Sequence, residues 1–305
     1  MEIHNKKLLP DIAIGIASVS PIIGCKAGCA YCYLGLRNAF SPVENCFGIE
    51  ETIQYLLENP KFKKGKEGTI ICLGGWGEMF PHSVDLRNAS IKWIQQLTEL
   101  ENPIVIFTKA ALNNDEIAKL VGFQVYEKQI LLLLSITCIH NYRDVEPNTD
   151  DPIDRLESLY RCCTANLHSG ILLNPFLRKY SEADYEELII YLRRMQLCGL
   201  VVSPLFYNKV LLEKFRKNMI LSPICDRIKN QDEKNRLHMS NEEFRVYAED
   251  ISDLYEYIFS VSEQNGIPCW KHYSCLVMNY FHQYNSDIFR KELCNCCGHC
   301  ITFLS

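Results

Sequence analysis

The sequence predicts an α/β fold in which helices cover a parallel sheet. Short apolar segments alternate along the chain with amphipathic segments of helical length. The apolar segments are rich in Ile, Val and Leu, as expected for strands that are covered on both faces. A chain of 305 residues with 48% hydrophobic residues is also large enough to bury such a sheet. This alternation is typical of parallel strands joined by right-handed crossovers.

The first two thirds of the chain contain six strand–helix units. The expected strands are residues 11–18, 68–73, 103–108, 129–137, 167–173 and 199–205. The expected helices are residues 49–58, 84–100, 115–121, 152–165 and 182–197. Ser181 followed by Asp184 is typical of a helix N-cap, and places the start of the last helix there. Six units fall short of the eight that close a barrel.

The pattern changes beyond about residue 205. Residues 208–219 and 241–265 are expected to be helices, joined by a polar stretch at 226–235, and Ser240 with Glu243 marks a second N-cap. A cysteine-rich tail follows from Cys269 to the end. We therefore expect a sheet domain at 1–205 and a C-terminal helical, cysteine-rich extension at 206–305.

Composition limits the functional classes. A net charge of −5 gives no general basic surface for nucleic acid, which disfavours this partner without excluding it. The first ten residues contain no apolar core of a signal peptide, and no apolar run has membrane-spanning length; the stretch 130–136 has the size of a strand. The sixteen cysteines are therefore expected to be reduced thiols of a cytoplasmic protein without membrane contact, several of them metal ligands.

Three cysteines follow the first expected strand in a CxxxCxxC spacing: Cys25, Cys29 and Cys32. Iron–sulfur cubes normally take one thiolate per iron. A loop with three thiolates can hold a 4Fe–4S cluster and leave one iron open for a small chelating molecule. The alternatives are a structural zinc loop and a chance spacing in a cysteine-rich chain.

With Tyr31 just before the last cysteine, this loop resembles the signature of the radical S-adenosylmethionine (SAM) superfamily. The resemblance implies a partial (β/α)6 parallel barrel, a 4Fe–4S cluster on the three cysteines and SAM on the open iron. It also implies reductive cleavage of SAM to a 5′-deoxyadenosyl radical, which abstracts hydrogen from a substrate. Tyr31 matches an aromatic position near the adenine, although simple packing beside the loop explains it equally well.

A glycine-rich element follows the second expected strand. The superfamily commonly has a Gly-Gly-Glu-like element here that receives the SAM amino group, and Gly74, Gly75 and Glu78 match it. Glycine lets a ligand approach the backbone, and a carboxylate pairs with an ammonium group. Trp76 and Gly77 interrupt the simple motif. The alternative is an ordinary glycine turn before the next helix.

Polar side chains stand at the ends of the later strands. Thr108, Lys109, Ser135 and Asn174 are placed to bind the ribose hydroxyls and carboxylate of SAM, and Arg155 is a further candidate. The segments around Lys109 and from Ser135 to Arg155 loosely resemble the spore photoproduct lyase-like branch of the superfamily. For Lys109 and Arg155 the alternative is a surface ion pair, which contributes little stability.

The remaining cysteines allow two further roles. Cys72 and Cys138, at strand ends, are candidate hydrogen-atom donors, although a buried cysteine is usually a small hydrophobic residue. Six cysteines are candidates for a second metal site: Cys269, Cys275, Cys294, Cys296, Cys297 and Cys300. That site would hold a second 4Fe–4S cluster or zinc. The alternatives to a metal site are redox-active thiols and cysteines that bind no metal.

The substrate follows least directly from the sequence. The acidic balance and the cysteine-rich tail favour a peptide-modifying maturase, and aromatic residues such as Trp76 and Phe206 suit a peptide or a stacked base equally. A lyase that repairs a nucleic-acid lesion and an enzyme for small molecules are the catalytic alternatives. A non-catalytic iron–sulfur or zinc protein is the third class. A radical SAM enzyme also needs an electron donor, such as a reductase, flavodoxin or ferredoxin.

Overall fold

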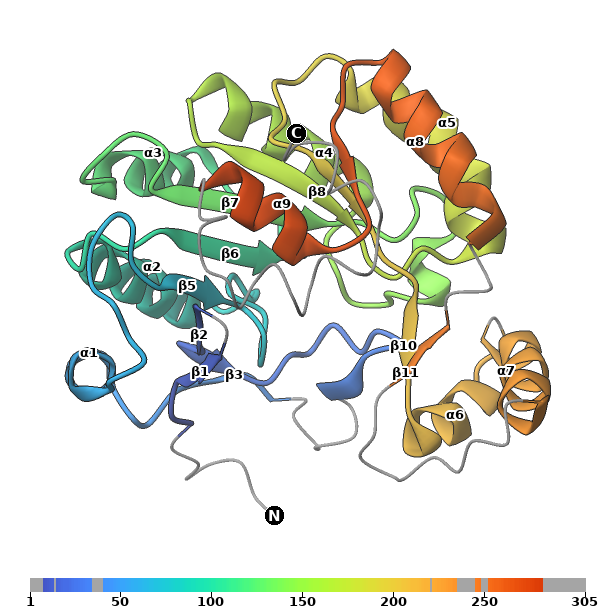
Figure 1. Cartoon of the computed structure of the whole chain (residues 1–305), viewed down its shortest axis with the longest axis horizontal. Coiled ribbons are helices and arrows are strands. Elements are labelled where there is room, and N and C mark those ends of the chain that lie inside the picture. Colours follow the sequence, from blue (N-terminus) through green and yellow to red (C-terminus); the bar gives the residue numbers. More distant parts are fainter. Residues whose placement is uncertain are drawn as a thin grey trace.

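The computed structural model describes residues 8–13, 15–34, 41–219, 221–234, 245–247 and 252–281. Its centre is an eight-stranded sheet (Figure 1). The strands, in their order across the sheet, are β1 (Asp11–Ala13), β2 (Ile16–Val19), β5 (Ile70–Leu73), β6 (Ile104–Thr108), β7 (Ile130–Ser135), β8 (Ser169–Leu173), β9 (Leu200–Val202) and β12 (Cys269–Trp270). Only β1 is antiparallel to its neighbour; the other pairs in this sheet are parallel.

Two small antiparallel pairs accompany the sheet: β3 (Ile22–Ile23) with β4 (Val43–Glu44), and β10 (Leu205–Tyr207) with β11 (Arg245–Tyr247). The helices are α1 (Ile49–Glu58), α2 (Val84–Thr98), α3 (Asn114–Phe123), α4 (Pro152–Thr164), α5 (Arg178–Leu192), α6 (Lys209–Arg216), α7 (Ser222–Lys234), α8 (Tyr255–Gln264) and α9 (Tyr273–Tyr280). Short 3₁₀ turns occur at Tyr142–Asp144 and Ser252–Leu254. None of the described helices is long and apolar enough to cross a membrane.

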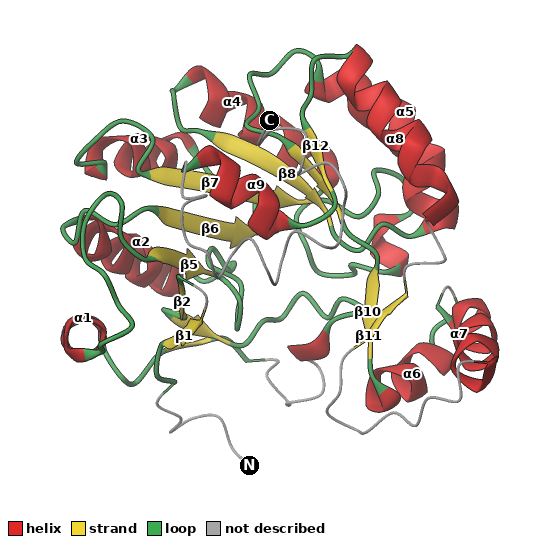
Figure 2. Cartoon of the chain, viewed as in Figure 1, coloured by secondary structure: helices red, strands yellow, loops and turns green. Residues whose placement is uncertain are grey.

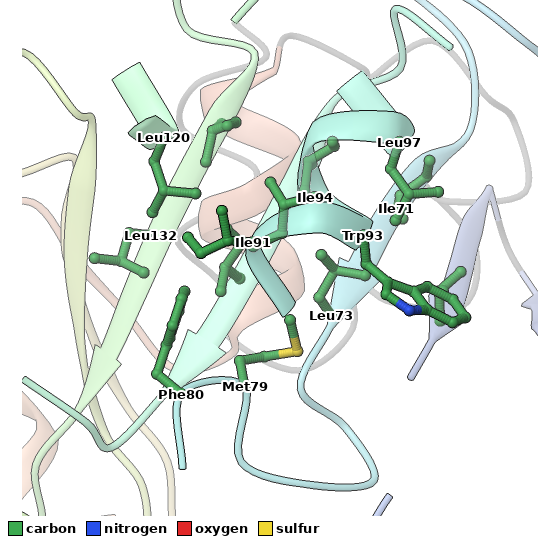
Figure 3. Close-up of a cluster of buried hydrophobic side chains, with 14 of the residues drawn as sticks. Ile71, Leu73, Met79, Phe80, Ile91, Trp93, Ile94, Leu97, Leu120 and Leu132 are labelled. Carbon is green, nitrogen blue, oxygen red and sulfur yellow. The ribbon is translucent and has the colours of Figure 1, made fainter. Parts of the chain in front are cut away.

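The sheet is covered on both faces, as its apolar strands predict. Ile71 and Leu73 point from β5 to the outer side, where Trp93 and Leu97 of α2 are fully buried against them (Figure 3). Cys72, between them in the strand, points to the opposite face and packs in the cluster that α9 completes. Figure 2 shows α9 lying across this inner face, with α2, α3 and α4 behind the sheet.

Local signals account for the starts of several helices. The side chain of Asn113 accepts the Glu116 N–H at 2.9 Å, and Glu116 accepts the Asn113 N–H in return, so a capping box opens α3. At the start of α4, the Asp151 side chain accepts the Ile153 N–H at 2.9 Å, with Pro152 in the first turn. These helices therefore begin within one residue of their predicted starts.

The predicted α/β fold with a partial parallel barrel is confirmed, because all six predicted strands occur and lie in sequence order in one sheet. The first predicted strand is in fact two: the chain reverses at Gly15, whose φ of 72° suits glycine, so that β1 folds back on β2. The seventh parallel strand, β12, is not predicted, because its two residues, Cys269 and Trp270, are too few to give a strand pattern.

The predicted start of the helix at 182 is wrong, because α5 begins at Arg178. The two supposed capping residues hold α5 against the loop after β7 instead. Ser181 Oγ donates to the Thr137 carbonyl at 2.6 Å, and the Asp184 carboxylate accepts the N–H of Ile139 at 2.6 Å. The same sequence pattern that is typical of a helix N-cap thus arises here from side chains that form tertiary hydrogen bonds.

Two predictions about the C-terminal region are also wrong. The polar stretch 226–235 is mostly helical, because Leu221, Cys225 and Ile228 are buried at helical spacing where α7 packs against α6. In its described parts, 245–247 and 252–265, the predicted helix 241–265 contains strand β11, a 3₁₀ turn and the ten-residue α8. The predicted N-cap at Ser240 lies outside the described residues.

Candidate active site

A cleft of about 640 Å³ opens where the carboxyl ends of the parallel strands meet. Its wall is formed by the loop after β3, the loop after β5, the ends of β6, β7 and β8, and residues from β10, α6 and α9. Several segments that are far apart in the sequence therefore converge on one space, which is the usual arrangement of an active site in such folds.

Cys25, Cys29 and Cys32 all line this cleft. Their loop is fixed to two other loops by backbone hydrogen bonds: Gly24 N–H donates to the Trp76 carbonyl at 2.9 Å, and Ala30 N–H donates to the Val145 carbonyl at 2.8 Å. The three thiols are thus held at the mouth of the sheet by the loops after β5 and β7.

The thiols fit an iron–sulfur cube better than a single metal ion. Across the described part of the chain, no three His, Cys, Asp or Glu side chains converge closely enough to hold one ion. Mononuclear zinc needs four ligands around one point, whereas a cube takes thiolates one per iron at separate corners. Burial, aided by the charge of Glu78, raises the pKa of Cys25 to about 12, so metal binding there must displace a proton.

The glycine-rich loop after β5 lines the same cleft. Gly74 has a φ of 98°, and a Cβ there would overlap the carbonyl oxygen of Phe107. A Cβ on Gly77 would overlap the carbonyl of Ile22. Gly75 differs, because a Cβ would meet only the Ser18 hydroxyl, at 3.4 Å. Gly74 and Gly77 are therefore required by the fold, whereas Gly75 leaves its space to the cleft.

The carboxylate of Glu78 is bound by the protein itself. It accepts the Phe80 N–H at 3.0 Å, the Lys109 N–H at 2.9 Å and the Thr108 hydroxyl. Met79 and Phe80 follow it into the outer core, where both are almost fully buried (Figure 3). A carboxylate offers about four acceptor positions, so Glu78 retains capacity for one further donor in the cleft.

A buried carboxylate that the sequence analysis did not single out lies beneath the cleft. Glu146 is fully buried and bonds Lys109 Nζ at 3.0 Å, Arg155 Nη2 at 3.0 Å and Thr137 Oγ1 at 2.6 Å. It also accepts the Tyr31 hydroxyl. Burial alone would raise the pKa of Glu146, but the charges of Lys109 and Arg155 and these hydrogen bonds hold it at about 2. Glu146 is therefore a carboxylate with two buried cationic partners.

This network decides what the neighbouring residues can do. Lys109 Nζ bonds both Glu146 and Ser135 Oγ, the latter at 2.5 Å, and both Lys109 and Ser135 line the cleft. Arg155 does not line the cleft; its guanidinium is fully buried and donates to the Ser135 carbonyl at 2.7 Å. The surface ion pair considered for Lys109 and Arg155 is therefore wrong for Arg155, because no part of this side chain reaches solvent.

Comparison by sequence gives no relatives: no protein-family model matches the chain, and no curated protein matches it. Comparison by structure gives clear similarities of the fold. Spore photoproduct lyase with bound AdoMet and dinucleoside spore photoproduct has a TM-score of 0.61 at 17% identity, and the match covers 84% of this chain and 76% of that chain.

The second group is SuiB of Streptococcus suis. SuiB bound to S-adenosylmethionine has a TM-score of 0.55 at 14% identity, over 90% of this chain and 55% of that chain. SuiB bound to its precursor peptide SuiA has a TM-score of 0.54 at 13% identity, over 90% and 53%. The fold of this chain is that of spore photoproduct lyase and SuiB. At these identities the likeness concerns the fold.

Most residues chosen from the sequence as ligands of SAM lie together in this fold. They all line the cleft: Tyr31, Gly74, Gly75, Glu78, Thr108, Lys109, Ser135 and Asn174. The ring of Tyr31 lies between the cleft and the buried network, with Lys109 Nζ 5.6 Å from its centre. The structure shows that these residues converge on one cleft. The binding of SAM by each of them remains a prediction.

The candidate hydrogen-atom donors are less well placed. Cys72 and Cys138 are buried and do not line the cleft, and burial raises the pKa of each thiol to about 12. Cys72 packs on the inner face of the sheet, and Cys138 packs beside Tyr142 and Leu205. Their role as donors remains a prediction that the geometry does not support.

The predicted second metal site is only partly described. Cys269, on β12, packs in the outer cluster next to α8, whereas Cys275 belongs to α9 and is buried in the inner cluster. These two thiols therefore face opposite sides of the sheet. The other four candidates, Cys294, Cys296, Cys297 and Cys300, lie outside the described residues.

Proposed function

We propose that this protein is a radical SAM enzyme that modifies a peptide. The observation that carries the proposal is the convergence of Cys25, Cys29 and Cys32 with Gly75 and Glu78 on one cleft at the carboxyl ends of parallel strands. The fold shared with spore photoproduct lyase and SuiB supports it independently, because that comparison uses the backbone and not these side chains.

In this proposal Cys25, Cys29 and Cys32 hold a 4Fe–4S cluster. When bound, the cluster and SAM supply one-electron reductive cleavage of SAM to a 5′-deoxyadenosyl radical, with the electron coming from a reductase, flavodoxin or ferredoxin. Glu78 accepts the SAM ammonium with its remaining acceptor position, next to the open backbone of Gly75. Lys109 and Ser135 present hydrogen-bonding groups on the facing strand ends.

The protein's own groups keep the site ordered. Glu146 pairs with Lys109 and Arg155 and accepts the Tyr31 hydroxyl, so the wall below the cluster loop carries fixed charges. Such preorganised groups exclude competing reactions of a reactive cofactor. The protein therefore positions the cluster, SAM and substrate, and the bond-breaking chemistry belongs to the cofactor.

The outer wall of the cleft supports a peptide substrate. Tyr33, Phe206 and Tyr273 are each about 40% exposed and line the cleft, and Tyr273 packs edge-on against Phe107 at 5.2 Å. Among the described lining residues, Lys109 is the cation, and Glu146 already pairs with it. An apolar, aromatic wall without an unpaired cation suits a hydrophobic peptide side chain. The SuiB structure with its precursor peptide adds an example on the same fold.

The second candidate is a nucleic-acid repair lyase. The higher TM-score to spore photoproduct lyase with its dinucleoside ligand favours it, and exposed aromatic rings also stack on bases. The net charge of −5 and the neutralised Lys109 argue against it, because nucleic-acid binding depends on phosphate contacts.

The cysteine-rich tail remains part of the proposal. We assign Cys294, Cys296, Cys297 and Cys300 to a second iron–sulfur or zinc site on their spacing. None of the twelve cysteines in the described ranges forms a disulfide, and this proposal needs a reducing, cytoplasmic setting.

Anaerobic reconstitution tests the enzyme class. Protein loaded with iron and sulfide, reduced with dithionite and mixed with SAM should release 5′-deoxyadenosine. Cys29→Ala should abolish this release, whereas Cys46→Ala, at an exposed cysteine away from the cleft, should retain it. A fully loaded cluster that never cleaves SAM would mean a non-catalytic iron–sulfur protein.

Deuterium transfer tests the substrate class. The loaded enzyme is incubated with SAM and either a deuterated peptide digest or a deuterated dinucleoside spore photoproduct, and the 5′-deoxyadenosine is analysed by mass spectrometry. Deuterium gained from the peptides supports the maturase. Deuterium gained only from the dinucleoside would replace it with the repair lyase.

A further inference from the structure

The proposed cluster loop is contacted by a lysine from outside the sheet. Lys214 lies on α6, more than 180 residues further along the chain, and its Nζ donates to the carbonyl oxygens of Cys29 at 3.2 Å and Cys32 at 3.3 Å. These are the backbone carbonyls of two of the three proposed cluster ligands. The sequence analysis did not select Lys214, because a lysine in an amphipathic helix gives no local signal.

Helix α6 presents this lysine on its buried face. Leu211, Lys214 and Phe215 share one face of the helix, and Leu211 and Phe215 are fully buried next to Ala30 of the cluster loop. The Asn208 side chain caps the helix by accepting the Leu211 N–H at 2.8 Å. Packing and capping together fix the direction from which Lys214 reaches the loop.

The other basic residues of this segment behave differently. Lys209, Arg216 and Lys217 are exposed, whereas Lys214 is half-buried. No carboxylate in the described part of the chain forms an ion pair with Lys214; its recorded hydrogen bonds are the two to the cysteine carbonyls. The carbonyls satisfy its N–H donors but leave its charge without a counter-ion, and a partly desolvated charge without a counter-ion is costly.

A three-thiolate cluster would supply that counter-charge. A 4Fe–4S core of charge 2+ with three thiolates carries a net charge of −1, and the entry of one electron makes it −2. A fixed cation therefore stabilises the reduced form more than the oxidised form, and net charge and hydrogen bonding are known determinants of cluster potential. The step is a transfer of one electron from an external reductant to the cluster, and no bond or proton changes at Lys214.

We propose that Lys214 is a positioning residue that holds the cluster loop and raises the reduction potential of its cluster, so that packing of α6 sets the reducibility of the active site. This inference rests on the proposed function, because it requires a cluster on Cys25, Cys29 and Cys32. It adds a specific role for α6, whose Leu211 also lines the cleft and which lies beside the sheet in Figure 1.

The test is a redox titration of the reconstituted full chain without SAM, followed by electron paramagnetic resonance of the reduced cluster. Lys214→Met removes the charge and the donor, and Lys214→Gln removes the charge but keeps a donor. Both should lower the reduced-to-oxidised ratio at a fixed potential by about tenfold, which equals about 59 mV for a one-electron couple. Lys214→Arg should restore most of the ratio.

Lys217→Met is the matched control, because it removes an exposed lysine at the end of the same helix. It should leave the midpoint unchanged. The titration reads only the molecules that carry a cluster, so incomplete iron loading of a variant does not hide the result. Neutral variants of Lys214 with the wild-type midpoint would overturn the inference.

Failure of the proposed function gives a different result. In that case wild type and Cys29→Ala would hold the same iron, and neither would show a reducible cluster on this loop. If the wild-type cluster cleaves SAM and the neutral Lys214 variants have the same midpoint potential as wild type, only the role of Lys214 is rejected.

Discussion

Glu146 allows the sharpest test of the structure. Glu146→Gln keeps the size of the side chain but removes the charge that Lys109 and Arg155 share, each at 3.0 Å. Glu146 and Arg155 are completely buried, so the substitution leaves at least one buried cation without its counter-ion. Breaking a buried pair in this way typically costs about 3–5 kcal/mol.

The pKa of Glu146 gives an independent magnitude. It is about 2, against an ordinary value of 4.5, and each pKa unit corresponds to about 1.4 kcal/mol. The ionised form is therefore favoured by roughly 3 kcal/mol in the folded protein. Because the folded pKa is the lower one, this stabilisation is present above about pH 4.5 and is lost as the pH falls toward 2.

The assay is urea unfolding of cluster-free, thiol-reduced protein at pH 7 and at steps down to pH 3. Glu146→Gln should lose about 3 kcal/mol or more of unfolding free energy at pH 7, and its stability should depend less on pH below 4.5 than that of wild type. Glu187→Gln is the control, because Glu187 forms an exposed pair with His140 that is expected to contribute under about 1 kcal/mol. A Glu146→Gln protein within 1 kcal/mol of wild type at pH 7 would refute the buried network.

Three further predictions concern the loops and the tail. Gly75→Ala should leave the melting temperature unchanged, because the added Cβ meets only Ser18 Oγ. It should weaken SAM binding, measured by equilibrium dialysis, about tenfold, because the Cβ enters the cleft. An unchanged affinity would mean that SAM does not bind next to this glycine. Gly77→Ala should cost about 1–3 kcal/mol of unfolding free energy or more, because its Cβ overlaps backbone, and a neutral effect would contradict the loop contact. Cys29→Ala should lose the cluster and all SAM cleavage, whereas Cys300→Ala should lose iron from a second site and substrate turnover but keep SAM cleavage. Equal iron loss in the two cysteine variants, or no loss in the second, would contradict two separate sites.

The parts predicted correctly from the sequence are those that depend on local pattern. A run such as 130–134 is apolar at every position and becomes most of the buried strand β7 (Ile130–Ser135). Once the strands are known to be parallel, their carboxyl ends must meet, which places Thr108, Ser135 and Asn174 on one cleft without any knowledge of packing. The cysteine loop follows from the same reasoning.

The missed residues depend on contacts between distant segments. Glu146 is a single carboxylate in a loop, and only its meeting with Lys109 and Arg155 gives it a role. Lys214 matters because α6 folds back on the cluster loop. Ser181 and Asp184 failed in the opposite way, because the same short side chains that cap helices also serve tertiary hydrogen bonds.

The departure from the simple Gly-Gly-Glu motif has a structural reason. The two additional residues let the loop after β5 reach the start of the cluster loop, where the Trp76 carbonyl accepts the Gly24 N–H at 2.9 Å and Gly77 packs against the Ile22 backbone. The Tyr33 hydroxyl adds a hydrogen bond to the Gly75 carbonyl. Each of these contacts joins the loop proposed to hold the cluster to the loop proposed to hold SAM. A substitution at Gly77 should therefore lower iron retention and SAM affinity together, because it disturbs the contact between these two loops.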